Sequence, residues 1–217
     1  MARTTVPLTL DLLAQLDAPC RSCVFWQLDP VRRERLSADE ARAEKEAWVS
    51  EILREWGSCG RVLMIDGEPR GYILYAPEAY LPGAASFPTA PISPDAVLLA
   101  TAWVDASYDG VGMGRLLIQG MARDLVTRGG GEIRAVEAFA RLRGGGPGGA
   151  HSCTLPADFL ARVGFKTHRP HPTTPRMRMD LRSTVTWRDE FGAAWERLVH
   201  VVRPTPAKAP TPAHRER

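Results

Sequence analysis

Glycines at alternate positions stand in the middle of the chain, where their spacing could serve to bind an anion. Gly110, Gly112 and Gly114 follow a nearly continuous apolar run (Ala96–Val104) and precede an amphipathic stretch at residues 114–128. The run predicts a buried strand and the stretch predicts a helix. Glycine permits positive φ and close approach to a ligand, and the first amides of a helix have no partner within it. The segment therefore predicts a cradle for an anion such as a pyrophosphate, although a strand-to-helix turn without a ligand would show the same glycines.

A dinucleotide-binding turn is a second interpretation of these glycines. It requires Gly-x-Gly-x-x-Gly near the start of a βαβ unit and an acidic residue about twenty positions later. The spacing in this chain differs, and the turn comes in mid-chain after a predicted hairpin. The pattern therefore disfavours a dinucleotide-binding domain.

The glycine turn resembles the coenzyme A-binding motif of the GCN5-related N-acetyltransferase (GNAT) family, Arg/Gln-x-x-Gly-x-Gly/Ala. Residues 109–114 align with it, and residues 104–108 have the preceding Val-x-x-x-aromatic pattern. Residues 158–165 are similar to the family's second motif, a short helix that ends in Gly-Phe. The resemblance covers residues 61–181, and the two motifs in this order are more specific than either one alone.

The resemblance implies that the protein transfers an acetyl group from acetyl-CoA to an amine that the sequence does not identify. Backbone amides of residues 111–115 would hold the pyrophosphate. The backbone of Trp103 and Val104 would bind the pantetheine and polarise the acetyl carbonyl. The expected cofactor-binding residues are Trp103, Val104, Asp109, Gly110, Val111, Gly112, Met113, Gly114 and Arg115.

Acetyl transfer also requires a base for the amine and an acid for the leaving thiolate. The family's usual acid is a tyrosine, but Leu160 occupies its position, and Asp109 stands where the family prefers Arg or Gln. We therefore predict Glu137 or Asp105 as the base and Cys153 as the acid, with ordered water as the alternative for either role. Further candidates for the acid are Tyr108, His151, Ser152, His168 and His171. The two departures also leave open a regulatory module that binds acyl-CoA without efficient transfer.

Cys20 and Cys23 form a Cys-x-x-Cys pair that could bind a metal or act in redox chemistry. A structural zinc site needs four ligands, and the chain has no second such pair. Cys59, Cys153 and His151 could complete a site only if the fold brought them together. Two unpaired thiols at a strand edge are the simpler interpretation, so we expect no metal. A thiol- or metal-sensing module remains a third hypothesis.

The remaining segments predict an α/β (α+β) domain with a partly antiparallel sheet. The resemblance makes this a GNAT fold, with a central mixed, mostly antiparallel sheet flanked by helices. Further helices are expected at residues 9–16, 37–56, 156–163 and 190–200, and further strands at residues 23–28, 61–65, 71–76, 133–140 and 177–181. Residues 77–95 contain five prolines and predict a long loop.

Length and composition favour one domain at residues 1–202, followed by a disordered tail rich in Pro, Ala and Arg at residues 203–217. The net charge of +3 is too small to indicate a nucleic-acid partner. No apolar run reaches the roughly 20 residues of a membrane helix, and the N-terminus lacks a signal-peptide core. We therefore expect a cytoplasmic protein without a membrane partner, with a small-molecule or protein amine as acceptor and a homodimer as one option for assembly.

Overall fold

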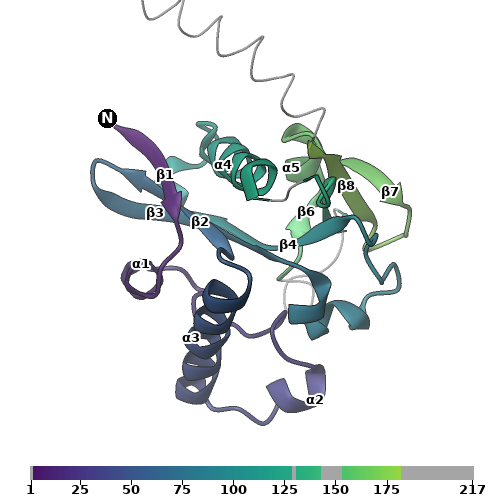
Figure 1. Ribbon diagram of the computed structural model, residues 1–217, viewed down its shortest axis with the longest axis horizontal. Helices are drawn as coiled ribbons and strands as arrows, with labels where there is room; N and C mark the ends of the chain where they lie inside the picture. Colours follow the sequence, from purple (N-terminus) through teal and green to yellow (C-terminus); the bar gives the residue numbers. More distant parts are fainter. Residues whose placement is uncertain (1, 129–130, 143–152, 182–217) are drawn as a thin grey trace, which may run out of the picture. The chain divides into compact units, whose positions relative to one another are not determined.

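A sheet of eight strands is the centre of the computed structural model, which describes residues 2–128, 131–142 and 153–181 (Figure 1). The main order is β1-β2-β3-β4-β5-β8-β7, and β6 also pairs with β5. The strands are β1 (Arg3–Pro7), β2 (Gly60–Ile65), β3 (Glu68–Ala76), β4 (Ala96–Val104), β5 (Ala135–Arg141), β6 (Leu155–Pro156), β7 (Lys166–Arg169) and β8 (Arg176–Asp180). Only β4–β5 and β5–β6 are parallel among these pairs, so the predicted mixed, mostly antiparallel sheet is confirmed.

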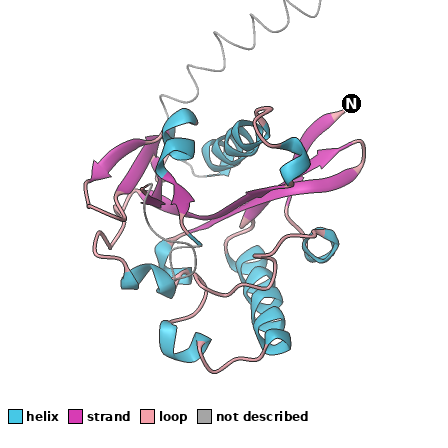
Figure 2. Cartoon of the chain, turned by 180° about the vertical axis from the view of Figure 1, so that it is seen from behind, coloured by secondary structure: helices cyan, strands magenta, loops and turns pink. Residues whose placement is uncertain are grey.

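Helices cover both faces of this sheet. Figure 1 shows α4 and α5 on one face and α1, α2 and α3 on the other, and Figure 2 shows the same layers from behind. The helices are α1 (Leu10–Gln15), α2 (Pro30–Arg33), α3 (Ala38–Glu55), α4 (Met113–Arg128) and α5 (Ala157–Arg162). The apolar core is divided in the same way, with Leu117 and Leu160 in the cluster under α4 and α5, and Leu13 and Ile52 in the cluster under α1 and α3. None of the helices in these described segments is long and apolar enough to cross a bilayer.

Local sequence signals explain several element boundaries. Ser37 and Glu40 form the predicted capping box at the start of α3, and Gly57 follows its end with φ +87°. Asp66 and Gly67 both have positive φ, as a two-residue hairpin turn between β2 and β3 requires. These boundaries place α3 and the hairpin as the sequence predicts.

The predicted strand at residues 23–28 is wrong, because this segment forms turns. Its aromatic side chains are buried under the sheet, where the Trp26 ring stacks on Phe87 with centroids 5.2 Å apart. Their enrichment therefore reflects burial and not strand pairing. The structure also adds β1, α2, β6 and β7, which were not predicted, and two short 3-10 helices, Glu78–Tyr80 and Pro82–Ser86, within the predicted loop.

Some predictions concern residues outside the described ones. These are the candidate residues His151 and Ser152, the helix at residues 190–200, the tail at residues 203–217 and the end of the domain at residue 202. The described residues belong to one compact unit, and the domain boundary stays a prediction.

Candidate functional site

The two central strands separate along part of their length. Residues 96–98 of β4 pair with residues 135–137 of β5, but β4 continues to Val104 without further pairing to β5. β5 instead pairs with β6 from Ala140 onward. In the described part of the chain, this edge of β4 therefore offers backbone amides and carbonyls to a ligand.

A bulge in β4 lies at the point where the strands separate. Leu74 of β3 pairs with Thr101 and Tyr75 pairs with Leu99, so Ala100 is an extra residue in β4. Such a bulge interrupts the ladder and changes the direction of the following side chains. Leu99 and Ala102 consequently pack on the same side of the sheet, against the cluster under α4 and α5.

The glycine turn connects this strand to α4. Gly110 and Gly112 have φ values of +73° and +84°, and a Cβ at either position would meet no atom within 4 Å. Glycine is required here by backbone conformation, and the turn is open to a ligand. The amide of Leu116 donates to the carbonyl of Gly112 at 3.2 Å, so the earlier amides have no partner four residues back within the helix.

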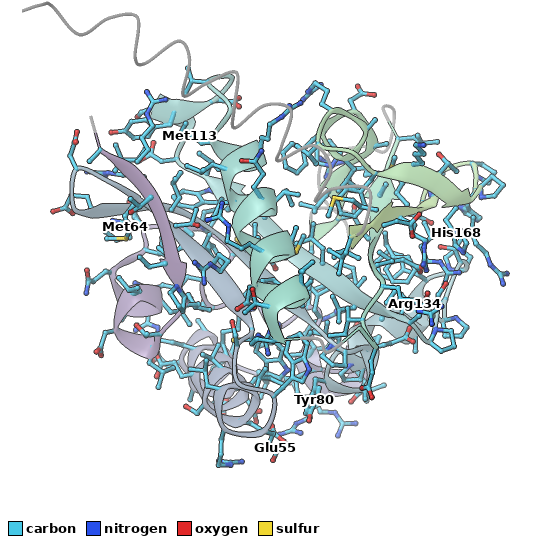
Figure 3. The ribbon with its side chains drawn as sticks, turned by 45° about the horizontal axis from the view of Figure 1, so that its top comes forward. Glu55, Met64, Tyr80, Met113, Arg134 and His168 are labelled. Atoms are coloured by element: carbon cyan, nitrogen blue, oxygen red, sulfur yellow. The ribbon has the colours of Figure 1, made fainter. Side chains whose placement is uncertain are left out.

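A pocket of about 640 Å³ lies between the end of β4, the glycine turn and α5. Met113, the first residue of α4, lines it and marks one end of that helix in Figure 3. Phe159 of α5 forms part of the opposite wall, and a Cβ on Gly114 would come within 2.6 Å of its ring. Gly114 is therefore required for a close contact between α4 and α5.

Two arginines give the pocket a positive character. Arg115 and Arg162 both line it, and the Arg115 guanidinium donates to the Arg162 carbonyl at 2.9 Å. The Asp109 carboxylate, which also lines the pocket, accepts a hydrogen bond from the amide of Gly110 at 2.8 Å. Guanidinium groups, unpaired helix amides and the helix dipole all favour an anion such as a phosphate.

Comparison with solved structures identifies the fold. The PaiA N-acetyltransferase of Thermoplasma acidophilum, in complex with coenzyme A, has 13% identity and a TM-score of 0.52 over 83% of this chain and 99% of that one. An N-acetyltransferase from Staphylococcus aureus has 15% identity and a TM-score of 0.51, with the same coverage. AAC(6')-Ib in complex with ribostamycin and coenzyme A has 15% identity and a TM-score of 0.53 over 86% and 97% of the two chains.

The chain has the GNAT fold. No family model matches the sequence, and no curated protein matches it. At these identities the likeness concerns the fold alone. The expectation of a GNAT fold is confirmed.

The GNAT motif residues converge on the pocket. Its lining contains Trp103, Val104, Asp109, Gly110, Gly112, Met113, Gly114 and Arg115. Val111 does not line it and is 53% exposed on the turn. Sequence reasoning did not single out Phe159 or Arg162 as binding residues, although both lie in the second motif, which was the signal that could have identified them.

Glu137, a predicted base, lies outside the pocket lining. Its carboxylate is fully buried, 3.1 Å from the Arg176 guanidinium and 3.3 Å from that of Arg178, and accepts from the amide of Ser93 at 3.2 Å. The imidazole of His168 lies 3.9 Å away. Figure 3 shows His168 well apart from Met113. This arrangement makes Glu137 the anion of a buried ion-pair network.

Asp105, the other predicted base, lies next to the pocket and holds the backbone after β4. Its carboxylate accepts from the amide of Ser107 at 2.9 Å and is 3.7 Å from the Arg70 guanidinium. The hydrogen bonds from Ser107 lower the pKa of Asp105, and Arg70 adds to the effect. A lower pKa makes a carboxylate a weaker base.

Cys153, the predicted acid, lies 3.4 Å from Cys23, sulfur to sulfur, and does not line the pocket. Leu160, at the position of the GNAT tyrosine, is fully buried in the core. Tyr108 is the residue with a hydroxyl group in the pocket lining. Among the described residues, no cluster of His, Cys, Asp or Glu has the arrangement of a metal site.

Proposed function

We propose that the protein transfers an acetyl group from acetyl-CoA to an amine. The observation that carries this proposal is the pocket in which the unpaired edge of β4 meets the glycine turn and the start of α4. The unpaired edge of β4 offers hydrogen bonds to amide groups of a ligand, and the glycine turn and the start of α4 favour a pyrophosphate. A ligand that contains both groups in one extended molecule fits this arrangement.

The residues of the pocket divide between the parts of such a ligand. In our proposal, the amides of residues 111–115 and the guanidinium groups of Arg115 and Arg162 hold the pyrophosphate. The backbone of Trp103 and Val104 binds the pantetheine arm. Acetyl-CoA supplies an activated acetyl thioester, and an amide beside the β4 bulge would stabilise negative charge on its oxygen.

Tyr108 is our proposed proton donor to the leaving thiolate. Its side chain lines the pocket, whereas Leu160 can donate no proton and is buried. Glu137, Asp105 and Cys153 lie outside the lining, and their catalytic roles stay predictions. A Tyr108→Phe variant would lower turnover and leave coenzyme A binding intact if the proposal is correct.

The acceptor is an amine, of a small molecule or of a protein. The GNAT-fold protein AAC(6')-Ib is found with ribostamycin, which makes an aminoglycoside one member of the panel to be tested. Release of free thiol from acetyl-CoA reports transfer to any amine in such a panel. Binding without thiol release would favour the regulatory module instead.

Calorimetry with coenzyme A tests the pocket through two matched glycines. Gly112 and Gly67 have φ values of +84° and +90°, and neither has an atom within 4 Å of an added Cβ. Gly112→Glu and Gly67→Glu therefore carry a similar backbone cost, of the order of 1 kcal/mol. Only the first brings a carboxylate to the proposed pyrophosphate site.

We expect Gly112→Glu to weaken coenzyme A binding by about 100-fold or more, equivalent to about 2.7 kcal/mol. Gly67→Glu should bind as the wild type does. Equal affinities for both variants, or no binding by the wild type, would contradict the proposed cofactor site.

A further inference from the structure

The four cysteines of the chain surround one buried cation on the α3 face of the sheet. Lys45 of α3 is 1% exposed, and its ammonium donates to the carbonyl of Cys23 at 2.8 Å and to the Gln27 amide oxygen at 3.1 Å. Within the described residues, no Asp or Glu lies within ion-pair distance of Lys45. An isolated ammonium in such a place is costly, and a thiolate nearby would compensate its charge.

Cys23 is next to Cys153 and not paired with Cys20. The Cys23 and Cys153 sulfurs are 3.4 Å apart, although 130 positions separate the residues in the sequence. The Cys20 sulfur instead accepts from the Tyr72 hydroxyl at 3.1 Å. Of the two cysteines in the Cys-x-x-Cys motif, only Cys23 belongs to the close pair, and its partner Cys153 comes from a distant segment.

Cys20, Cys23 and Cys59 have different electrostatic surroundings. The hydrogen bond with Cys153 lowers the pKa of Cys23 to about 6, with further contributions from the backbone, Lys45 and Arg33 that outweigh desolvation. Burial raises the pKa of Cys20, and it raises that of Cys59 to about 12. The surroundings of Cys23 therefore favour its thiolate. Cys23 and Cys153 are both partly exposed and within reach of a small oxidant.

We propose that Cys23 and Cys153 form a redox modification site that closes into a reversible disulfide. A peroxide oxidises the Cys23 thiolate to a sulfenic acid and is itself reduced to hydroxide. The Cys153 thiol then attacks the sulfenic sulfur, a sulfur–sulfur bond forms, and water leaves. The sulfurs need to move from 3.4 Å to about 2.05 Å apart. A dithiol reductant reverses the reaction by thiol–disulfide exchange.

One member of this site is close in sequence to a residue of the pocket wall. Cys153 is two positions before Leu155, the first residue of β6, and Leu155 lines the pocket. The bond would join the segment before α2 to the start of β6. The inference depends on the thiols alone and holds or fails independently of acetyl transfer.

Peptide mapping of the full-length protein after peroxide treatment tests the proposal. Trypsin cleaves after Arg21, so Cys20 and Cys23 fall in different peptides, and Cys153 falls in a third. We expect non-reducing mass spectrometry to show the Cys23 and Cys153 peptides joined, with the loss of two hydrogen atoms. Dithiothreitol should separate them again. A Cys20–Cys23 crosslink, or no crosslink in the wild type, would overturn the proposal.

Single serine variants give matched controls. Cys153→Ser should leave Cys23 as a sulfenic acid that a dimedone probe labels, and Cys23→Ser should abolish labelling and crosslinking. Cys20→Ser should crosslink as the wild type does, since Cys20 has a separate partner in Tyr72. Far-ultraviolet circular dichroism checks that each variant is folded. Peroxide-dependent labelling of Cys23 that is unchanged by Cys153→Ser would contradict a role for Cys153.

Discussion

Glu137 shows how a side chain with catalytic chemistry can serve a structural purpose. Its carboxylate lies between two guanidinium groups, and Arg176, one of the pair, is only 2% exposed. Removing one member of a buried ion pair leaves an uncompensated charge, which costs more than the pair itself contributes. The ion pair also joins β5 to β8, since Glu137 and Arg178 are register partners.

We expect Glu137→Gln to lower the free energy of unfolding by about 3 kcal/mol, because the neutral amide leaves Arg176 without a buried counter-charge. Urea denaturation measures this change. Glu44→Gln is the matched control, since the Glu44–Arg32 pair is on the surface and should contribute less than about 1 kcal/mol. Equal stability losses in both variants would contradict the network, and a loss of turnover with unchanged stability would favour Glu137 as the base.

The thiol of Cys23 predicts a pH dependence of stability. The fold lowers the pKa of Cys23 from its ordinary value of 9.0 to about 6, so its contribution to stability is complete above pH 9 and is lost as the pH falls through 6. In reducing buffer, we expect the free energy of unfolding to rise by about 1–2 kcal/mol between pH 6 and pH 8. The charged or titratable groups around this thiol are Cys20, Lys45, Cys153, Arg33 and Tyr72.

Urea denaturation at several pH values compares the wild type with Cys23→Ser. The variant should lack this rise, because serine does not titrate in the range. The burial of Lys45 lowers its pKa to about 8, so its contribution to the pH dependence of stability changes mainly above the range from pH 6 to pH 8. Parallel pH profiles for the two proteins would show that the thiol is not ionised as described.

Residue types predicted the conformation of the glycine turn better than the surroundings of the candidate proton-transfer groups. A cradle made of backbone is encoded by glycines, and Gly110 and Gly112 have the positive φ that their spacing suggested. A carboxylate such as Glu137 gives no such signal, because its role depends on which strand lies opposite it. The guanidinium groups that neutralise it come from β8. The sequence predicted this strand but not which residues of β5 lie opposite it.

At the scale of elements, the contact between α4 and α5 forms one wall of the pocket. Gly114 and Gly120 both lie on α4, and an added Cβ at either would come within 2.6 Å of another side chain. The neighbour of Gly114 is Phe159 of α5, and the neighbour of Gly120 is Thr5 of β1. The same substitution at the two positions therefore distinguishes an effect on the pocket wall from an effect on the rest of the helix.

We expect Gly114→Ala to raise the Kd for coenzyme A by about fivefold, a cost of the order of 1 kcal/mol, because Phe159 must move within the pocket wall. Gly120→Ala should leave Kd unchanged. In both variants, alanine stabilises the helix by about 1 kcal/mol relative to glycine, and the close contact of its Cβ opposes this gain. The two variants should therefore have similar free energies of unfolding. Calorimetry and thermal denaturation measure the two effects. Weaker binding in both variants would show that α4 moves as a whole.

Elements with local signals were predicted, and elements that depend on distant partners were not. A capping box at Ser37 and a turn at Asp66 mark their elements within a few residues of sequence. β1 is a short edge strand whose pairing with β2 depends on residues more than fifty positions away. Residues 23–28 have strand-like composition, but their side chains fill the core under the sheet.

At the scale of the whole molecule, ligand binding should stabilise the folded chain. Coenzyme A at 100 times its Kd adds about 2.7 kcal/mol to the free energy of unfolding. For a protein of this size we expect the Tm to rise by roughly 5 °C or more. Pantetheine, which lacks the pyrophosphate, should give a smaller rise. Differential scanning fluorimetry measures these shifts, and Gly112→Glu should show a much smaller one at the same concentration of coenzyme A. Equal shifts for both ligands would contradict a pyrophosphate site at the glycine turn.

Both outer strands of the sheet are short and carry basic side chains. β7 is exposed along its four residues, which include Lys166, His168 and Arg169, and β1 begins at Arg3 and ends at Pro7. An unpaired strand edge is a template for joining another chain, and charge or proline at that edge opposes it. Two copies that met edge to edge at β7 would bring like charges together. Within the described residues, the sheet thus ends in strands whose basic side chains and proline oppose edge-to-edge joining.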